Sequence, residues 1–192
     1  MTTPQDVLDF WFLPAGHAGH GKPRGEWFRK DAAFDETIRQ QFGAVIETAL
    51  AGGLPEWTAT PPGILAYILV LDQFTRNVFR DTARAFAGDA LSLSIATRTV
   101  TSGLDRQLTP IQRWFVYMPF EHAEDMAAQT RSVELFTTLA AEAEGFGNVL
   151  DYAIHHRDIV ARFGRFPHRN ALLGRASTTQ EIDFLKQPGS SF

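Results

Sequence analysis

The chain of 192 residues contains no cysteine. Disulfide bonds, thiol nucleophiles and thiolate metal sites are therefore excluded. The composition suits the reducing cytoplasm, where we expect the protein to reside. Basic residues are also scarce: 22 acidic residues outnumber 18 lysines and arginines and leave a net charge of −4. Because proteins that bind nucleic acid usually carry a basic surface, we expect no nucleic-acid partner.

Long apolar runs are missing as well. The longest strongly apolar stretch, Ile64 to Leu71, is far shorter than the ~20 residues that cross a bilayer, so we expect no membrane span. The N-terminus has no basic segment before an apolar run, which argues against a signal peptide. A glycine-rich phosphate loop, a dinucleotide fingerprint and a Gly-x-Ser-x-Gly elbow are absent too. The sequence therefore indicates no cofactor.

Aromatic residues and helix-ending residues are abundant. The chain has 16 phenylalanines and four tryptophans, and such large side chains suit a core built from crossing helices. No alternation of apolar and polar residues is bounded by hairpin turns, so strands are not expected. The sequence predicts an all-α protein of about eight helices joined by short connections. We expect them to form a single domain over residues 1–192.

The helices are predicted from apolar residues at helical spacing and from residues that begin or end helices. A proline follows Thr60 and another follows Thr109, which places two helix starts. Gly164 is expected to end a helix, and Pro119 to interrupt one. The expected helical ranges are 6–12, 31–50, 61–80, 88–101, 109–118, 120–143 and 147–163. Thr178-Thr-Gln-Glu181 fits a capping box for a final short helix.

Polar residues occupy one face of the central helix, where the pattern otherwise predicts burial. An α-helix turns by ~100° per residue, so several residues that follow the apolar segment 64–71 fall into a single stripe. They are Asp72, Gln73, Arg76, Asn77 and Arg80. This stripe is either a buried network that closes one end of a core helix or the wall of a pocket. The buried network is the favoured interpretation.

Two further stripes combine histidine with carboxylates. The first comprises Glu121, His122, Asp125 and Gln129. Helix capping and pairing with arginine explain its acids. The second comprises Asp151, His155, Asp158 and Arg162, spaced i, i+4, i+7 and i+11. Paired helices of this kind can hold a metal, but the spacing matches neither di-iron bundles nor zinc proteases, so no metal is expected.

The most unusual stretch is Arg162-Phe-Gly-Arg-Phe-Pro-His-Arg-Asn170, which Arg175 follows closely. A guanidinium is planar and permanently charged, and it recognises carboxylate or phosphate bidentately. These arginines therefore either receive an anionic ligand or pair with the protein's own acids. Internal pairing is favoured, because enough acidic residues lie near predicted helix ends to neutralise these arginines. The acids are Asp72, Glu121, Glu124, Asp125 and Asp158. We expect Arg165 and Arg169, around Pro167, to lack an internal partner.

Four stretches carry a family resemblance: Val7-Leu-Asp-Phe-Trp-Phe12, Leu71-Asp-Gln-Phe-Thr-Arg-Asn77, Met118-Pro-Phe-Glu-His122 and Phe163-Gly-Arg-Phe-Pro-His-Arg-Asn-Ala-Leu-Leu-Gly-Arg175. Together they resemble a bacterial family known as domain of unknown function 924, over nearly the whole chain. The resemblance implies an α–α superhelix of antiparallel helix pairs, similar to tetratricopeptide-repeat proteins. It implies no activity and no catalytic residues. Thr75 stands where the family pattern often has proline, and it should straighten the helix.

Three functions remain open. The first is a non-catalytic module that binds a carboxylate or phosphate group of a peptide or small molecule. The second is an enzyme acting on an anionic substrate, with His122, His155 or His168 as general acid or base beside Asp125 or Asp158. The third is a purely structural role for the polar network. The candidate ligand-binding residues are Arg76, Asn77, Arg80, His122, Asp125, His155, Arg162, Arg165, His168, Arg169 and Arg175.

Overall fold

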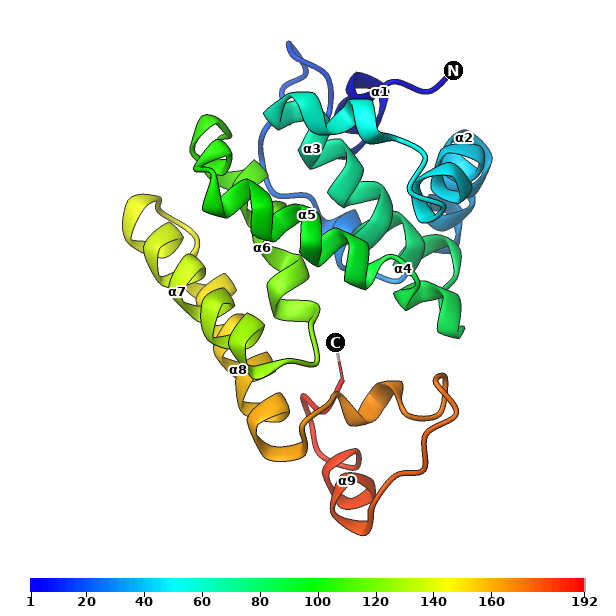
Figure 1. The fold of residues 1–192 in the computed structure, drawn as a ribbon, viewed down its shortest axis with the longest axis vertical. Helices are drawn as coiled ribbons and strands as arrows, with labels where there is room; N and C mark the ends of the chain where they lie inside the picture. Colours follow the sequence, from blue (N-terminus) through cyan, green and yellow to red (C-terminus); the bar gives the residue numbers. More distant parts are fainter. Residues whose placement is uncertain (192) are drawn as a thin grey trace. The chain divides into compact units, whose positions relative to one another are not determined.

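The computed structural model describes residues 1–191, and every regular element among them is helical. Figure 1 shows the α-helices. They are α1 (Pro4–Phe12), α2 (Ala32–Leu50), α3 (Pro61–Ile68), α4 (Thr75–Val78), α5 (Asp89–Thr101), α6 (Pro110–His122), α7 (Met126–Glu142), α8 (Gly147–Phe163) and α9 (Thr179–Phe184). The all-α prediction is confirmed. The superhelical arrangement of tetratricopeptide-repeat proteins stays a prediction. No helix among residues 1–191 is both long enough and apolar enough to span a bilayer.

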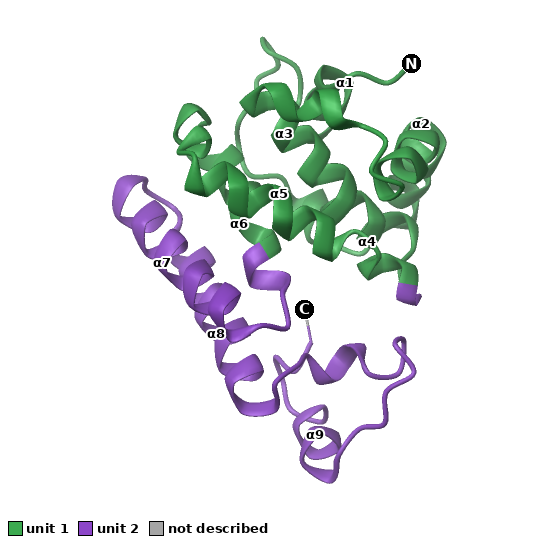
Figure 2. Ribbon diagram, viewed as in Figure 1, with its two compact units in different colours: residues 1–80, 84–119 green, residues 81–83, 120–192 purple. Residues whose placement is uncertain are grey.

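The chain divides into two compact units, which Figure 2 shows in green and purple. Unit 1 comprises residues 1–80 and 84–119, and unit 2 comprises residues 81–83 and the chain from residue 120 onward. Unit 1 therefore contains α1 to α5 and most of α6, whereas α7, α8 and α9 belong to unit 2. The single domain expected over residues 1–192 stays a prediction.

The core of unit 1 is built around an aromatic cluster, as the abundance of aromatic residues suggested. Trp11 of α1 is completely buried and stacks on Trp27 with ring centroids 5.8 Å apart. Its ring centroid also lies 5.6 Å from that of Phe74 and 5.6 Å from that of Phe115. Such pairs contribute ~0.5–1.5 kcal/mol each beyond the burial of their area. These rings fix α1 against the central helix and α6.

The central helix widens into a π-helical segment, Leu69–Phe74, between α3 and α4. The Thr75 hydroxyl donates to the carbonyl oxygen of Leu71 at 2.8 Å, one turn earlier. The expectation that Thr75 straightens the helix is therefore wrong. Gly88 packs directly on the widened turn, since a Cβ atom at this position would lie 2.2 Å from the Leu71 carbonyl oxygen. Only glycine permits this approach.

In unit 2, α7 and α8 form an antiparallel hairpin (Figure 1). Most of the helix ends predicted from the sequence are confirmed in the structure. Gly164 ends α8 in the left-handed conformation, with φ of 71°. Thr178 and Glu181 form the expected capping box of α9.

The expected break at Pro119 is wrong. α6 continues through this proline to His122, and α7 begins only at Met126. A proline removes one hydrogen bond to the preceding turn, which a helix tolerates near its end. A side chain of α7 stabilises the C-terminal end of α6: Gln129 Nε2 donates to the carbonyl oxygens of Glu121 at 2.6 Å and Ala123 at 2.7 Å.

Candidate functional site

Arg76 of α4 lies between two acids of unit 1. Its guanidinium donates to both carboxylate oxygens of Asp89, at 2.9 and 3.1 Å, and lies 3.2 Å from the buried carboxylate of Asp72. Burial opposes the charge of Arg76, but the two carboxylates outweigh this effect and raise its pKa. The guanidinium is thus engaged inside the protein.

Asn77 and Arg80 converge on one acid, Asp35, in the first turn of α2. Arg80 donates to both oxygens of Asp35, at 2.9 and 3.0 Å, and Asn77 Nδ2 donates to Oδ1 at 2.6 Å. The positive end of the α2 macrodipole favours an acid at this place. These contacts agree with the interpretation of the polar stripe as a network that closes the central helix.

The polar stripe predicted on α8 is not a buried face. Asp151, Asp158 and Arg162 are exposed, and His155 is half-buried with its Nε2 atom 2.7 Å from the carbonyl oxygen of Gly189. The face that packs into unit 2 runs through the next residue, His156, which the sequence analysis missed. The signal was available, because His156 shares helical spacing with three buried apolar residues, Val149, Ala153 and Val160.

Two further candidate residues, Asp125 and Arg162, interact with residues close to them in the sequence or in unit 2. Asp125 is the N-cap of α7 and accepts a hydrogen bond from the amide of Ala128 at 2.8 Å. Arg162 is exposed, with its guanidinium carbon 4.6 Å from the ring centroid of Phe163 and 5.6 Å from that of Phe184. Among residues 1–191 it has no ion pair with an acid.

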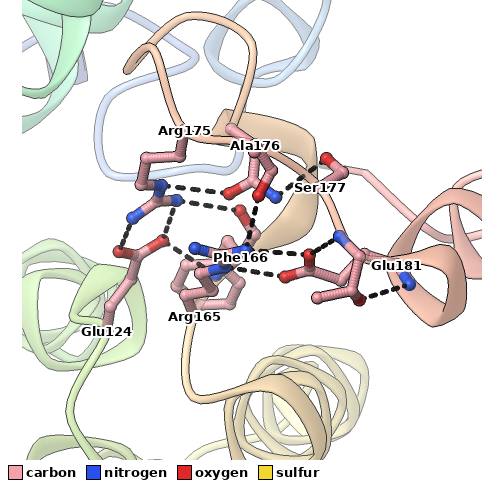
Figure 3. A network of polar contacts seen from close by, with 9 residues as sticks. Glu124, Arg165, Phe166, Arg175, Ala176, Ser177 and Glu181 are labelled. Atoms are coloured by element: carbon pink, nitrogen blue, oxygen red, sulfur yellow. Dashed lines mark hydrogen bonds and ion pairs between the residues drawn. The ribbon is translucent and has the colours of Figure 1, made fainter.

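We call residues 165–181, which run from the end of α8 to the first turn of α9, the arch. Arg165 closes it at one end by donating to both carboxylate oxygens of Glu181, at 2.7 and 2.8 Å, and to the carbonyl oxygen of Ala176 at 2.9 Å (Figure 3). The expectation that Arg165 lacks an internal partner is wrong. Glu181 was assigned only to the capping box, although the same carboxylate serves both purposes. The hydrogen bonds from Arg165 lower the pKa of Glu181 to about 2.

Arg175 fastens the middle of the arch to Glu124, the acid between α6 and α7. It donates to both carboxylate oxygens, at 2.5 and 2.8 Å (Figure 3). Its Nε atom donates to Asn170 Oδ1 at 3.0 Å. Glu124 also accepts from the main-chain amide of Phe166 at 2.8 Å. Burial raises the pKa of Glu124, but these hydrogen bonds outweigh it and lower the pKa.

Three side chains, those of His156, His168 and Arg169, surround the ring of Phe166, and the ring of His122 lies beside that of His156. We call His122, His156, His168 and Arg169 the imidazole cluster. The ring centroid of Phe166 lies 5.5 Å from that of His156, 5.8 Å from that of His168 and 4.5 Å from the Arg169 guanidinium carbon. The rings of His122 and His156 are 6.3 Å apart. The exposed fraction is 0% for Phe166, 4% for His156, 6% for Arg169 and 9% for His122. Buried groups of these types are uncommon outside paired or functional sites.

The imidazole cluster disfavours an additional proton on His156. Burial and the nearby His122 and Arg169 lower the pKa of His156 to about 2. Its Nδ1 atom lies 2.8 Å from the carbonyl oxygen of Tyr152, to which it donates, and 3.3 Å from a carboxylate oxygen of Glu121. Because the ring is neutral, the contact with Glu121 is not an ion pair. No group of three metal-ligating side chains is assembled among residues 1–191.

Residues 7–189 match the sequence profile of a family described as bacterial protein of unknown function, DUF924. The solved structure of a protein of unknown function from Agrobacterium tumefaciens is similar, with a TM-score of 0.83 and 39% sequence identity. The similarity covers 95% of this chain and 96% of that one. No curated protein matches the chain. The fold and the profile together confirm the resemblance seen in the sequence: the chain belongs to the DUF924 family of bacterial proteins.

Proposed function

We propose that the protein is a binding module for a small oxyanion, a phosphate or a carboxylate group, and that the imidazole cluster of unit 2 receives it. The observation that supports this proposal is the gathering of two imidazoles and one guanidinium around the buried ring of Phe166, with the ring of His122 beside that of His156. Arg165 and Arg175 have a different role. Their bidentate pairs with Glu181 and Glu124 hold the arch that carries His168 and Arg169.

An oxyanion matches the electrostatics of the cluster. The positive charge of Arg169 lowers the pKa of His156, so an anion placed among these groups would act in the opposite direction. In a site that excludes water, such attractions are several-fold stronger than on an exposed surface. A protonated imidazole also donates from both nitrogens. A carboxylate oxygen of Glu121 lies 3.3 Å from His156 Nδ1, and this acid would favour a ligand that carries a proton to share with it.

The same geometry favours binding over general acid–base catalysis. A general base works best when its pKa is close to the working pH, and His156 with a pKa of about 2 is too weak a base. Two residues considered as catalytic groups already interact with the main chain. The His155 ring contacts the carbonyl oxygen of Gly189, and Asp125 caps the N-terminus of α7. Asp158 is exposed and pairs with Arg157 at 2.7 Å.

The proposal can be tested by titrating the protein with inorganic phosphate and, separately, with succinate. We expect saturable binding by calorimetry, a shift of the His156 ring signals in NMR spectra, and a rise of the His156 pKa in the bound state. If phosphate alone binds, the ligand class is a phosphate; if succinate alone binds, it is a carboxylate.

A pair of matched variants locates the site. Arg169→Lys keeps the charge but loses the planar fork, so the affinity for the bound anion should fall by ~10-fold, which corresponds to ~1.4 kcal/mol. Arg162→Lys changes an exposed arginine of the same stretch and should leave the affinity unchanged. Equal affinities in both variants, or no saturable binding of either anion, would refute the proposal.

A further inference from the structure

A pocket lies entirely within unit 1, whereas the imidazole cluster belongs to unit 2. It is formed by α3, by the C-terminal half of α5, and by two short 3-10 helices, η2 (Pro55–Ala59) and η5 (Leu104–Gln107). Its volume is about 260 Å³. The residues that line it are Thr58, Ile64, Ile95, Arg98, Thr99, Ser102 and Leu104.

The floor of this pocket is apolar. Ile64 of α3 and Ile95 of α5 are part of the core, with exposed fractions of 3% and 2%, and Leu104 is half-buried beside them. A ligand that reaches this floor is expected to present an apolar group, such as an aliphatic side chain. Small-molecule sites commonly have such a floor, together with a few polar groups that fix the orientation of the ligand.

Arg98 supplies the positive charge of the pocket. It is exposed, and among residues 1–191 its guanidinium has no ion pair and no hydrogen bond. In this respect it differs from Arg76 of the same unit, whose guanidinium meets both Asp72 and Asp89. A guanidinium at the edge of an apolar pocket, without an internal acid, is suited to a carboxylate on the ligand.

The three hydroxyl groups of the pocket act as acceptors. Each already donates its proton to a main-chain carbonyl oxygen: Thr58 at 2.7 Å, Thr99 at 2.8 Å and Ser102 at 2.9 Å. Their oxygen lone pairs can therefore accept hydrogen bonds from a ligand. Thr99 and Ser102 also lie at the C-terminal end of α5, where the helix macrodipole favours a cation. An ammonium group satisfies both conditions.

We propose that this pocket binds a free aliphatic α-amino acid of the size of valine or leucine. The carboxylate pairs with Arg98, the ammonium donates to the hydroxyl oxygens at the end of α5, and the aliphatic side chain rests on Ile64 and Ile95. The volume of about 260 Å³ leaves room for a ligand of this size.

The experiment is a titration of the full chain with L-leucine, followed by amide NMR spectra and calorimetry. We expect saturable binding, with the largest shifts at the end of α5 and in η2. Leucinamide lacks the carboxylate and isocaproate lacks the ammonium group, so each should bind at least ~10-fold more weakly than leucine. If either analogue binds as tightly as leucine, or if leucine causes no saturable shift, the proposal is refuted.

Arg98→Gln provides the matching change in the protein. Because Arg98 is exposed, this variant should keep its melting temperature, yet it should bind leucine ~10-fold more weakly and bind leucinamide unchanged. Arg131→Gln is the control, an exposed helical arginine of α7 that pairs with Glu134. Equal leucine affinity in the two variants would overturn the role of Arg98. The leucine signals belong to unit 1 and the phosphate signals to unit 2, so the two proposals fail independently.

Discussion

The pair between Arg165 and Glu181 should stabilise the fold, and replacing Arg165 with alanine tests this. A pKa of about 2 for Glu181, in place of the ordinary 4.5, corresponds to about 3 kcal/mol of unfolding free energy. The Arg165 side chain keeps 27% of its surface exposed, and solvent screening reduces the expected contribution to about 2 kcal/mol. For a chain of this length, Arg165→Ala should lower the melting temperature by ~4–8 °C.

The pH dependence of this loss identifies its origin. The pKa of Glu181 is lower in the folded state, so the stabilisation is complete above pH 4.5 and disappears as the pH falls through 2. Urea unfolding of the wild-type protein and of Arg165→Ala should therefore differ by ~2 kcal/mol at pH 7 and by less than half of this at pH 3. Arg162→Ala is the control, and its cation–π contact should be worth less than ~1 kcal/mol. If the two alanine variants are equally stable at pH 7, the reasoning about Arg165 is refuted.

Three further predictions concern the packing and the titration of named residues. Gly88→Ala should lose ~2–3 kcal/mol, because its Cβ would lie 2.2 Å from a main-chain oxygen, whereas Gly43→Ala, in the open middle of α2, should gain ~0.5–1 kcal/mol in the same denaturation assay. Equal effects of the two changes would contradict the close approach at Gly88. Gln129→Leu should cost ~2 kcal/mol in urea unfolding, since two carbonyl oxygens at the end of α6 lose their donor. The pKa of His156 is about 2 in the folded state and ordinarily 6.5, so stability should fall by ~2 kcal/mol between pH 6.5 and 5 as the unfolded state takes up the proton. His156→Gln should lack this part of the acid sensitivity, and an unchanged pH profile would show that His156 is not its source.

The sequence predicted helix ends well where a single residue type decides them. The left-handed residue Gly164, the Thr60 cap before Pro61, and the capping box at Thr178 are all where local chemistry places them. Pro119 was predicted incorrectly because its effect depends on how much of the helix follows it. α6 ends three residues later, so the proline costs little. The π-helical turn before Thr75 packs against Gly88, and local spacing cannot predict a contact between residues so distant in sequence.

The polar residues were predicted less well than the helices, and for a different reason. The partner of Arg165 was missed because Glu181 was treated as a capping residue alone, although a carboxylate has two oxygens and can accept from both sources. His156 was missed because the adjacent His155 lay on a more conspicuous polar stripe. A helix face one residue away differs by about 100° in direction, which is enough to exchange an exposed position for a buried one.

The pair between Glu124 and Arg175 joins residues that are 51 positions apart along the chain, with α7 and α8 between them. A chain that is synthesised at ~5–20 residues per second reaches Arg175 only ~3–10 s after Glu124. During that interval the α7–α8 hairpin can already form, while Glu124 still lacks the guanidinium that will neutralise it. The arch can therefore close only after Arg175 and Glu181 have been synthesised, and a chain that ends at α8 would lack His168 and Arg169 of the imidazole cluster as well as the guanidinium that pairs with Glu124.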